Sequence, residues 1–593
     1  MCKPIDQMTD ANVTSYGFRL SPQQKQIWTS QQAFPGQSFR AVGAFEIAGS
    51  VDTERLKEAL RVVIERHEIL RTTFARPVGI KIPFQIVAES TAFFWQPHDL
   101  KSLAEKQQRD QVAALFEGEC REPAFLEDGP TLRCQMVALS TDRAVLLVSL
   151  PAICADSMTL TNLITEVCQV YQSNQEPASE LVQYADFAEW QNQLLESTDE
   201  RTLASKAYWN EAAAHAAPML PLEKRSRTAP APEFELLPFE INEELVEQLH
   251  TVASNSGAEL SDLLFLSWQT LISRMSGHRE FTIYRLCHGR KLEDFEAAPG
   301  PFDRYLPMRC ELGNDALPQA LARLTNQLRR AEEIQEYADA GDAGLLAGNA
   351  IAFEFEERSK WTTETLSISP LARFVFSNPF KLKLAAIHSA KQLSLTLQFN
   401  RTSLDRENCE RFAGYLRRVL AAVATESFAT TTIDSIDLLS DDEKRKLLVD
   451  ANDTSSAYSH DKCAHELFEA QVAKTPTATA VVCGDQQITY EQINVRSNQL
   501  AHLLREYGVR QNECVGMCVT RDVDAIVALL GILKAGAAYV PLQPDHPVAR
   551  LITQLEKARA PVCITNVTTL AESLRPHTRT IDFSRDAELL GNQ

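Results

Sequence analysis

Three side chains that can do chemistry stand close together in the stretch S-L-P-A-I-C-A-D-S-M, residues 149–158. Cys154 would act as a nucleophile if its pKa were lowered, whereas an ordinary cysteine here would be a small buried core residue. Asp156 offers a carboxylate for proton transfer, for an ion pair or for a helix cap, and a buried carboxylate needs a partner because an isolated buried charge is costly. Ser157 adds a hydroxyl. We take Cys154, Asp156 and Ser157 as candidate catalytic residues.

The elements around this stretch position it at a strand end. Two apolar runs, 132–139 and 144–150, are split by four polar residues and predict a β-hairpin. Apolar residues then recur at helical spacing over 160–167, and Asp156 or Ser157 would cap that helix. The candidate residues therefore lie between a strand and a helix N-terminus, a common place for a functional site.

The rest of the chain alternates between helical and strand patterns. The apolar residues over 51–74 predict a helix that continues into a strand. Those over 263–272 predict a second helix, which Gly277 ends. Further strands are predicted at 281–287, 305–312, 350–356 and 383–399, followed by a helix at 405–424. Proline-rich 217–232 and the weakly apolar 427–462 predict linkers. From Ala464 the pattern becomes helix, strand, helix.

Bulk properties exclude several classes of function. A chain of 593 residues is too long for one core and predicts several domains. The net charge of −20 disfavours a nucleic-acid or anionic-membrane partner. Thirteen scattered cysteines fit neither a disulfide framework nor a zinc site, and no signal or membrane-spanning run is present. These features predict a cytoplasmic protein.

Several segments resemble, in order, the motifs of nonribosomal peptide synthetases. Four of them are similar to condensation-domain motifs: L-S-P-Q-Q-K-Q-I-W at 20–28, R-H-E-I-L-R-T-T-F at 66–74, Y-A-D-F-A-E-W-Q at 184–191 and L-F-L-S-W-Q-T-L-I-S-R-M-S-G at 264–277. Three resemble the start of an adenylation domain: A-H-E-L-F-E-A-Q-V-A-K-T-P after Cys463, I-T-Y-E-Q-I-N-V-R-S-N-Q-L-A at 488–501 and L-K-A-G-A-A-Y-V-P-L-Q-P-D-H-P at 533–547. Together they cover nearly the whole chain.

The resemblance implies an α/β fold class: two chloramphenicol-acetyltransferase-like lobes in a V shape, plus a partial α/β adenylation subdomain. We expect these divisions of the chain: a condensation N-lobe at 15–195, a linker at 196–235, a C-lobe at 236–426, a second linker at 427–463, and the partial adenylation domain at 464–593.

The stretch at 149–158 is also where the family carries H-H-x-x-x-D-G. Asp156 matches the aspartate, but Pro151 and Ala152 occupy the histidine positions and Ser157 occupies the glycine position. The second histidine of the family sits in a tunnel between the lobes, where it positions or deprotonates the attacking amine, a task that suits the imidazole pKa. Ala152 offers neither a proton acceptor nor a hydrogen bond from its side chain.

The resemblance implies two further sets of site residues. Asp156 is expected to form a structural ion pair with Arg290, in the G-R that follows a second-lobe strand. The family pattern G-x-F-V-N-T-x-x-x-R reads here as G-P-F-D-R-Y-L-P-M-R at 300–309, which places Arg304 and Tyr305 at the asparagine and threonine positions. We expect Ala152, Arg304, Tyr305 and His288 to line the tunnel.

Two functions of different class remain open. The first is amide formation between carrier-bound acyl or peptidyl and aminoacyl thioesters, driven by positioning. The second is a noncatalytic interface domain that docks a carrier, an adenylation core or a tailoring enzyme. Heterocyclising, epimerising and other acyltransferase variants are disfavoured, because the first needs an aspartate at Pro151 and the second generally needs the lost histidine.

The expected partners and cofactors follow from the resemblance. We expect carrier domains bearing phosphopantetheine arms, the rest of the adenylation domain and a tailoring enzyme as partners, with no nucleic acid and no membrane. No cofactor or metal is expected to bind in this segment. ATP and Mg²⁺ would act only in a missing part of the adenylation domain, because the phosphate loop T-S-G-S-T-G-x-P-K-G does not follow residue 547.

Overall fold

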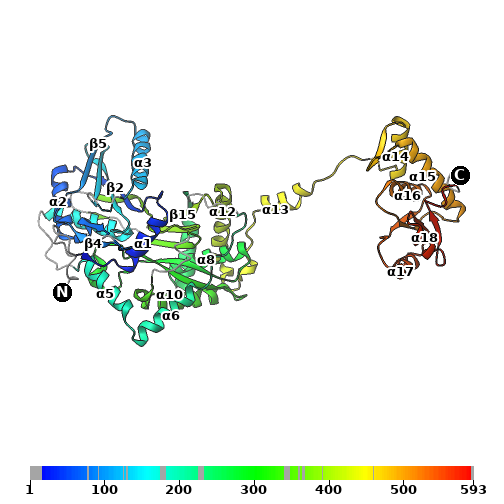
Figure 1. Ribbon diagram of the computed structural model, residues 1–593. Coiled ribbons are helices and arrows are strands. Elements are labelled where there is room, and N and C mark those ends of the chain that lie inside the picture. Colours follow the sequence, from blue (N-terminus) through cyan, green and yellow to red (C-terminus); the bar gives the residue numbers. More distant parts are fainter. Residues whose placement is uncertain are drawn as a thin grey trace. The chain divides into compact units, whose positions relative to one another are not determined.

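The computed structural model divides the chain into two compact units, Met1–Arg445 and Lys446–Gln593, which we describe separately. In Figure 1 the first unit runs from blue to green and the second from yellow to red. The structure describes residues 17–76, 79–90, 92–124, 126–127, 131–173, 182–224, 233–339, 348–357, 361–362, 367–389, 392–458 and 460–588. Within these ranges, no helix is long and apolar enough to cross a membrane.

The first lobe is built on a mixed sheet with strand order β12-β13-β2-β7-β6-β5. Its strands are β2 (Arg40–Ala48), β5 (Phe94–Asp99), β6 (Arg133–Ala138), β7 (Arg143–Pro151), β12 (Trp361–Thr362) and β13 (Ser367–Val375). A small sheet of order β1-β4-β3 lies in the same lobe and contains β1 (Gly17–Phe18), β4 (Phe84–Val87) and β3 (Thr72–Ala75). The helices of this part of the chain are α1 (Pro22–Ala33), α2 (Thr53–Arg66), α3 (Glu105–Arg121), α4 (Ser157–Ser173), α5 (Tyr184–Glu196) and α6 (Glu200–Ala213).

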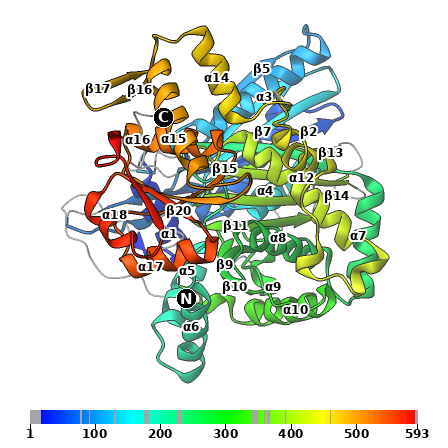
Figure 2. The same ribbon diagram turned by 90° about the vertical axis from the view of Figure 1, so that its right-hand side faces the viewer.

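The second lobe is built on a mixed sheet with strand order β10-β9-β11-β14-β15-β8. Its strands are β8 (Phe234–Ile241), β9 (Glu280–Cys287), β10 (Arg304–Glu311), β11 (Ile351–Glu357), β14 (Leu382–Ser389) and β15 (Gln392–Asn400). Its helices are α7 (Glu243–Asn255), α8 (Leu260–Ser276), α9 (Glu293–Glu296), α10 (Leu317–Glu333) and α12 (Arg406–Val423), and the short helix η2 (Gln335–Tyr337) follows α10. Figure 2 shows α8 and α10 beside β9, β10 and β11.

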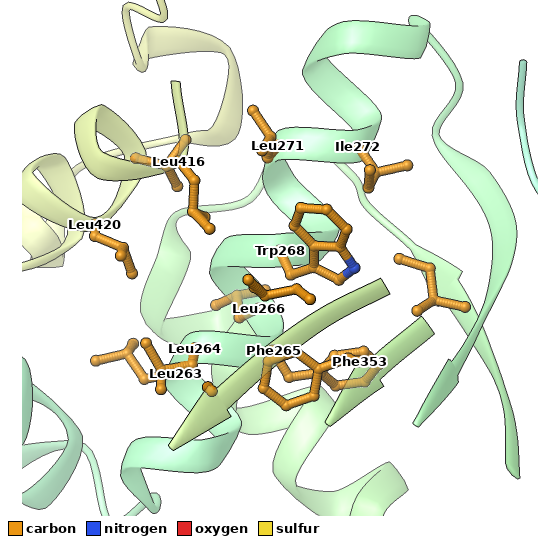
Figure 3. Close-up of a cluster of buried hydrophobic side chains, with 14 of the residues drawn as sticks. Leu263, Leu264, Phe265, Leu266, Trp268, Leu271, Ile272, Phe353, Leu416 and Leu420 are labelled. Carbon is orange, nitrogen blue, oxygen red and sulfur yellow. The ribbon is translucent and has the colours of Figure 1, made fainter. Parts of the chain in front are cut away.

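The core of the second lobe lies between its sheet and helix α8. Trp268 is fully buried on α8, and the ring of Phe265 packs against Phe353 of β11 with the two centroids 5.1 Å apart. Figure 3 shows these side chains together with Leu416 and Leu420, which come from α12. Burial of this apolar surface is the main force that holds the helices on the sheet.

Strand β13 ties the two lobes together. It comes late in the chain, from the second half of the unit, yet it pairs antiparallel with β2 of the first lobe, where Arg373 lies opposite Gly43. Strand β2 in turn pairs with β7, the strand that leads into the candidate loop. The sheet that positions the loop is therefore completed by a strand that sequence periodicity did not predict.

Most of the predicted elements are confirmed. Strands β6 and β7 form the expected hairpin, and α4 begins at Ser157. Helix α8 ends at Gly277, whose φ of 74° is the left-handed conformation that glycine adopts without strain. The run 383–399, expected as strand, is two antiparallel strands, β14 and β15.

The stretch expected as the first linker, 196–235, contains α6 and the start of β8. Helix α6 lacks an apolar stripe, but Trp209 is buried in the second-lobe core and donates its indole hydrogen to Ile334 O at 3.0 Å. Residues 225–232, which include two of the prolines on which the linker prediction relied, lie outside the described residues. In the stretch expected as the second linker, Ile433 and Ile436 also pack in this core.

The second unit contains a parallel sheet of order β19-β18-β20-β21 and a separate hairpin of β16 and β17. Its strands are β16 (Thr479–Cys483), β17 (Gln486–Thr489), β18 (Cys514–Cys518), β19 (Ala538–Pro541), β20 (Val562–Thr565) and β21 (Arg579–Asp582). Its helices are α14 (Ala464–Lys474), α15 (Tyr490–Glu506), α16 (Val523–Lys534), α17 (Val548–Ala558) and α18 (Thr568–Leu574), while α13 (Asp441–Leu448) spans the boundary between the units.

Candidate functional site

The loop between β7 and α4 is closed off from solvent. Ala152 is 1% exposed and its backbone N–H donates to Phe39 O at 2.9 Å. Cys154 is fully buried, and Asp156 is 2% exposed. Ala152, expected to line a tunnel, therefore presents its methyl group to the protein interior.

Asp156 anchors this loop to the second lobe. Its Oδ2 accepts hydrogen bonds from Arg290 Nη1 at 2.7 Å, from Phe302 N at 2.9 Å and from Asp303 N at 3.1 Å. Its Oδ1 accepts from Arg290 Nη2 at 2.9 Å and from Thr159 N at 2.7 Å, the latter within the first turn of α4. The structure thus brings Asp156 and Arg290 together, and the same carboxylate also bonds the helix N-terminus.

The charge of Arg290 holds this carboxylate ionised. Burial opposes ionisation, but the Arg290 charge and the hydrogen bonds from Arg290 and Thr159 outweigh it, so the pKa of Asp156 lies below its ordinary value of 3.8. Both side chains of the pair are less than 5% exposed. A carboxylate with both oxygens engaged in this way is suited to holding the loop rather than to transferring protons.

Gly300 lies against this anchor at a position where only glycine fits. Its φ is 146°, and a Cβ atom there would lie 2.0 Å from Cδ2 of Tyr184. The Tyr184 ring is held in place, because its hydroxyl bonds Ser21 Oγ at 2.8 Å and donates to Pro301 O at 3.0 Å. The glycine of the G-P-F-D-R-Y pattern is therefore a packing requirement.

Ser157 is tied into a buried polar network that joins three elements. Its hydroxyl donates to Glu356 Oε2 of β11 at 3.2 Å and accepts from Arg373 Nη1 of β13 at 2.9 Å. Arg373 also bonds Glu356 Oε1 at 2.5 Å and Thr161 Oγ1 at 2.7 Å. The hydroxyl that replaces the family's glycine thus joins α4 to the second-lobe sheet.

Arg304 connects the two lobes from the other side. Its Nη1 donates to Gln335 O of η2 at 2.5 Å. When the Gln23 amide on α1 is oriented so that its oxygen and nitrogen both find partners, that oxygen accepts from Arg304 Nη2 at 2.7 Å. Burial lowers the pKa of Arg304 from its ordinary value, a direction that the nearby Glu336 opposes. The guanidinium therefore bridges α1 of the first lobe and η2 of the second lobe.

Tyr305 belongs to a second buried cluster, on β10. Its hydroxyl donates to Glu354 Oε2 at 3.2 Å, and Lys383 Nζ donates to the same oxygen at 2.8 Å. Burial and the charge of Glu354 raise the pKa of Tyr305 well above its ordinary value of 10. Tyr305 therefore stays protonated and acts as a hydrogen-bond donor.

His288 follows β9 and pairs with an aspartate that sequence reasoning missed. Its Nδ1 lies 3.1 Å from Oδ1 of Asp303, the residue before β10, while its side chain is 40% exposed. The signal for Asp303 was visible in the sequence, because an acidic residue stands there where the family pattern has valine. Asp303 also donates its backbone N–H to Asp156, so this pair lies directly beside the loop anchor.

A pocket of about 370 Å³ lies between α1 of the first lobe and strands β9 and β10 of the second. Of the predicted tunnel residues, Arg304 and Tyr305 line it, whereas Ala152 and His288 are not among the described residues that do so. Its walls combine aromatic side chains with polar and charged ones, and they include Gln26, Trp209, Asn210, Tyr284, Arg304 and Tyr305. Such a mixture of apolar surface and convergent polar groups is typical of small-molecule sites.

Cys154 gives a first prediction. Burial raises the pKa of its thiol, and the nearby Arg40 offsets this only in part, so we expect no thiolate and no reaction with iodoacetamide in the native chain. Exposed Cys463 serves as the internal control and should be alkylated, as read by peptide mass spectrometry. Both should react in guanidinium chloride. Alkylation of Cys154 in the folded chain would contradict this prediction and support a nucleophilic role for the thiol.

Two family models match this chain. The model described as a condensation domain matches residues 17–448, and the model described as an AMP-binding enzyme matches residues 468–590. The chain therefore belongs to the condensation-domain family of nonribosomal peptide synthetases, with the N-terminal part of an adenylation domain after it. The two-lobed fold of the first unit is the fold that the sequence motifs predicted.

Individual relatives agree with this assignment. Gramicidin S synthase 2 of Brevibacillus brevis is 28% identical over 544 residues, which cover 89% of this chain and 12% of that protein. The chain thus spans about an eighth of the length of that relative. Holo-AB3403, a four-domain nonribosomal peptide synthetase solved with AMP and glycine, has a TM-score of 0.78 at 18% identity and is matched over 96% of this chain and 45% of that one. The X-domain from teicoplanin biosynthesis, solved in complex with OxyB, has a TM-score of 0.60 at 21% identity over 74% of this chain and 99% of that one.

Proposed function

We propose that the first unit catalyses amide formation between a carrier-bound acyl or peptidyl thioester and a carrier-bound aminoacyl amine. The observation that carries this proposal is the interlobe pocket, a chamber with aromatic, polar and charged walls. Its wall residue Arg304 directly follows Asp303, whose backbone N–H bonds the loop anchor Asp156. The loop that usually supplies an imidazole here supplies a methyl group, Ala152.

Positioning supplies the catalysis in this proposal. A thioester is already activated for attack by an amine, so the main barrier that remains is bringing the two groups together in the right orientation. Holding two reactants in a productive geometry lowers a barrier by about 7–11 kcal/mol in favourable cases. Trp209 and Tyr305 would pack against the acceptor arm, and Arg304 would orient its carbonyl groups.

The partners follow from the same proposal. Carrier domains would bring both substrates on phosphopantetheine arms, and the second unit would form a complete adenylation domain with the segment that follows it in relatives. ATP and Mg²⁺ would act in that complete domain. Within the described residues Lys534 bonds Asn494 Oδ1 at 2.5 Å and Asn498 Oδ1 at 2.7 Å, which supports a packing role rather than a nucleotide-binding one.

A second candidate function is noncatalytic docking of a tailoring enzyme. Two observations favour it: the contacts of Arg304 with Gln23 and of Ser157 with Glu356 across the lobes, and the likeness to an X-domain solved in complex with OxyB. Under this alternative the lobes would form a fixed platform, and no amide would form with any pair of carrier-bound substrates.

Intact-protein mass spectrometry of the loaded carrier domains separates the two functions. We expect condensed product with the wild-type chain and its loss in Ala213→Trp, which places an indole in the wall of the pocket. Ala204→Trp, on the exposed side of the same helix α6, is the matched control and should retain product. Absence of product with every matched pair, together with retained carrier or tailoring-enzyme binding, would favour docking.

A further inference from the structure

The loop between β7 and α4 lacks an imidazole, but the second lobe presents one close to the loop anchor. His288 and Asp303 form a dyad in which the aspartate engages Nδ1 at 3.1 Å. No residue that the structure describes forms a hydrogen bond with Nε2 of His288, and the side chain is 40% exposed. An imidazole held at Nδ1 by a carboxylate has its tautomer and orientation fixed, which leaves Nε2 as the proton acceptor.

The dyad lies on the pocket-facing side of the second-lobe sheet. Alternate residues of a strand share a face, so His288, which continues β9, lies on the same face as Tyr284, and Asp303 lies on the same face as Tyr305 of β10. Tyr284 and Tyr305 both line the pocket. His288 itself does not line the pocket, but its partner Asp303 adjoins the lining residue Arg304 in the chain and donates its backbone N–H to Asp156.

Several charged groups surround the imidazole, and their combined electrostatic effect favours its protonated form. Burial disfavours protonation, but the hydrogen bond and charge of Asp303 and the charge of Asp156 outweigh it and raise the pKa of His288 above 6.5, while Arg290 opposes them. Glu354 of β11 also interacts with His288. Burial and the charge of Asp156 raise the pKa of Asp303 itself.

We propose that His288 is the general base of this domain, with Asp303 as its positioning residue. This inference rests on the proposed amide-forming function. The amine nitrogen attacks the thioester carbonyl and forms the C–N bond, and Nε2 of His288 takes the proton that the nitrogen loses. The C–S bond then breaks, and the phosphopantetheine sulfur leaves as the thiol, taking the proton from the imidazolium. The second lobe therefore provides the imidazole base that the loop at 151–157 lacks.

Single-turnover amide formation by the full chain with loaded carrier domains tests this inference. We expect His288→Gln to slow the reaction by about 10²-fold or more, the lower range for general-base catalysis. His278→Gln is the matched control, because His278 is an exposed imidazole in the same lobe, and it should react at the wild-type rate. Unchanged thermal unfolding of His288→Gln would show that the slower rate is not a folding defect.

The pH profile distinguishes a chemical role from a structural one. The wild-type rate should rise with pH through the His288 pKa, above 6.5, because only the neutral imidazole accepts a proton. Asp303→Asn removes the carboxylate charge that favours the imidazolium, so the rising limb should move to lower pH. Hydrogen–deuterium exchange of the His288 ring, read by mass spectrometry, measures the same pKa without turnover.

The outcomes separate this inference from the function on which it rests. Product from the wild type with an equal rate for His288→Gln at every pH would overturn the dyad and leave amide formation standing. No product from the wild type with any matched pair would overturn both. A slow His288→Gln variant with an unshifted Asp303→Asn profile would remove Asp303 from the proposal.

Discussion

Asp156→Asn should destabilise the first unit by about 3–5 kcal/mol, the usual cost of removing one partner from a buried ion pair. The substitution keeps the shape of the side chain but leaves the Arg290 guanidinium, which is 4% exposed, without its counter-charge. Denaturant unfolding followed by tryptophan fluorescence measures this effect cleanly. All six tryptophans lie before residue 362, so their signal reports on the first unit alone.

Glu46→Gln is the matched control for this substitution. It removes a carboxylate from an ion pair with Arg143 of similar length, 2.7 Å, whose side chains are 32% and 49% exposed. Exposed pairs contribute about 1 kcal/mol or less, so the control should unfold almost like the wild type. Equal effects of the two substitutions would mean that the Asp156 pair does not anchor the loop.

The same variant has a defined pH dependence. Because folding lowers the pKa of Asp156, its ionisation stabilises the native state above the unfolded pKa of about 3.9, and this stability is lost as pH falls through the lower folded pKa. The difference in unfolding free energy between wild type and Asp156→Asn should therefore be full at pH 7 and shrink below about pH 4. A difference that stays constant down to pH 2 would contradict the depressed pKa.

Gly300→Ala should destabilise the same unit by a comparable amount. The φ of 146° is a conformation that alanine reaches only with strain of about 1–3 kcal/mol. The added methyl would also meet the buried Tyr184 ring at 2.0 Å, and overpacking of this kind costs about 1–3 kcal/mol more. Because Tyr184 is held at its hydroxyl by Ser21 and Pro301, the ring cannot move aside cheaply.

Gly118→Ala provides the opposite control. Gly118 lies in α3, and a Cβ atom there would have no neighbour within 4 Å. Alanine is the better helix former, so this change should stabilise the chain by about 0.5–1 kcal/mol. If Gly300→Ala unfolds like Gly118→Ala, then Gly300 is not confined by Tyr184.

The fold was predictable where apolar residues keep a local period. Helix α8 is apolar enough to be recognised alone, and the β6–β7 hairpin is marked by two apolar runs around a polar turn. Strand β13 was missed because Pro370 interrupts it, and because its partner β2 lies more than 300 residues earlier. Helix α6 was missed because it buries mainly Trp209 and small or polar residues.

The candidate site was predictable only in part. The Asp156–Arg290 contact could be expected because a buried carboxylate requires a cation, and the motif order pointed to Arg290. The partner of His288 could not be found from spacing, because Asp303 meets it only through the β9–β10 register. The contact of Ser157 with Arg373 depends on β13, which was itself unpredicted.

We propose that this domain forms amides although its motif loop carries no imidazole. The single-turnover rate constant for condensation of two loaded carrier domains, compared with the same carriers mixed alone, tests it most directly. We expect a rate at least about 10²-fold above that of the carriers alone, since positioning in the pocket replaces a chance encounter. Equal rates with and without the protein, for cognate donor and acceptor, would contradict it.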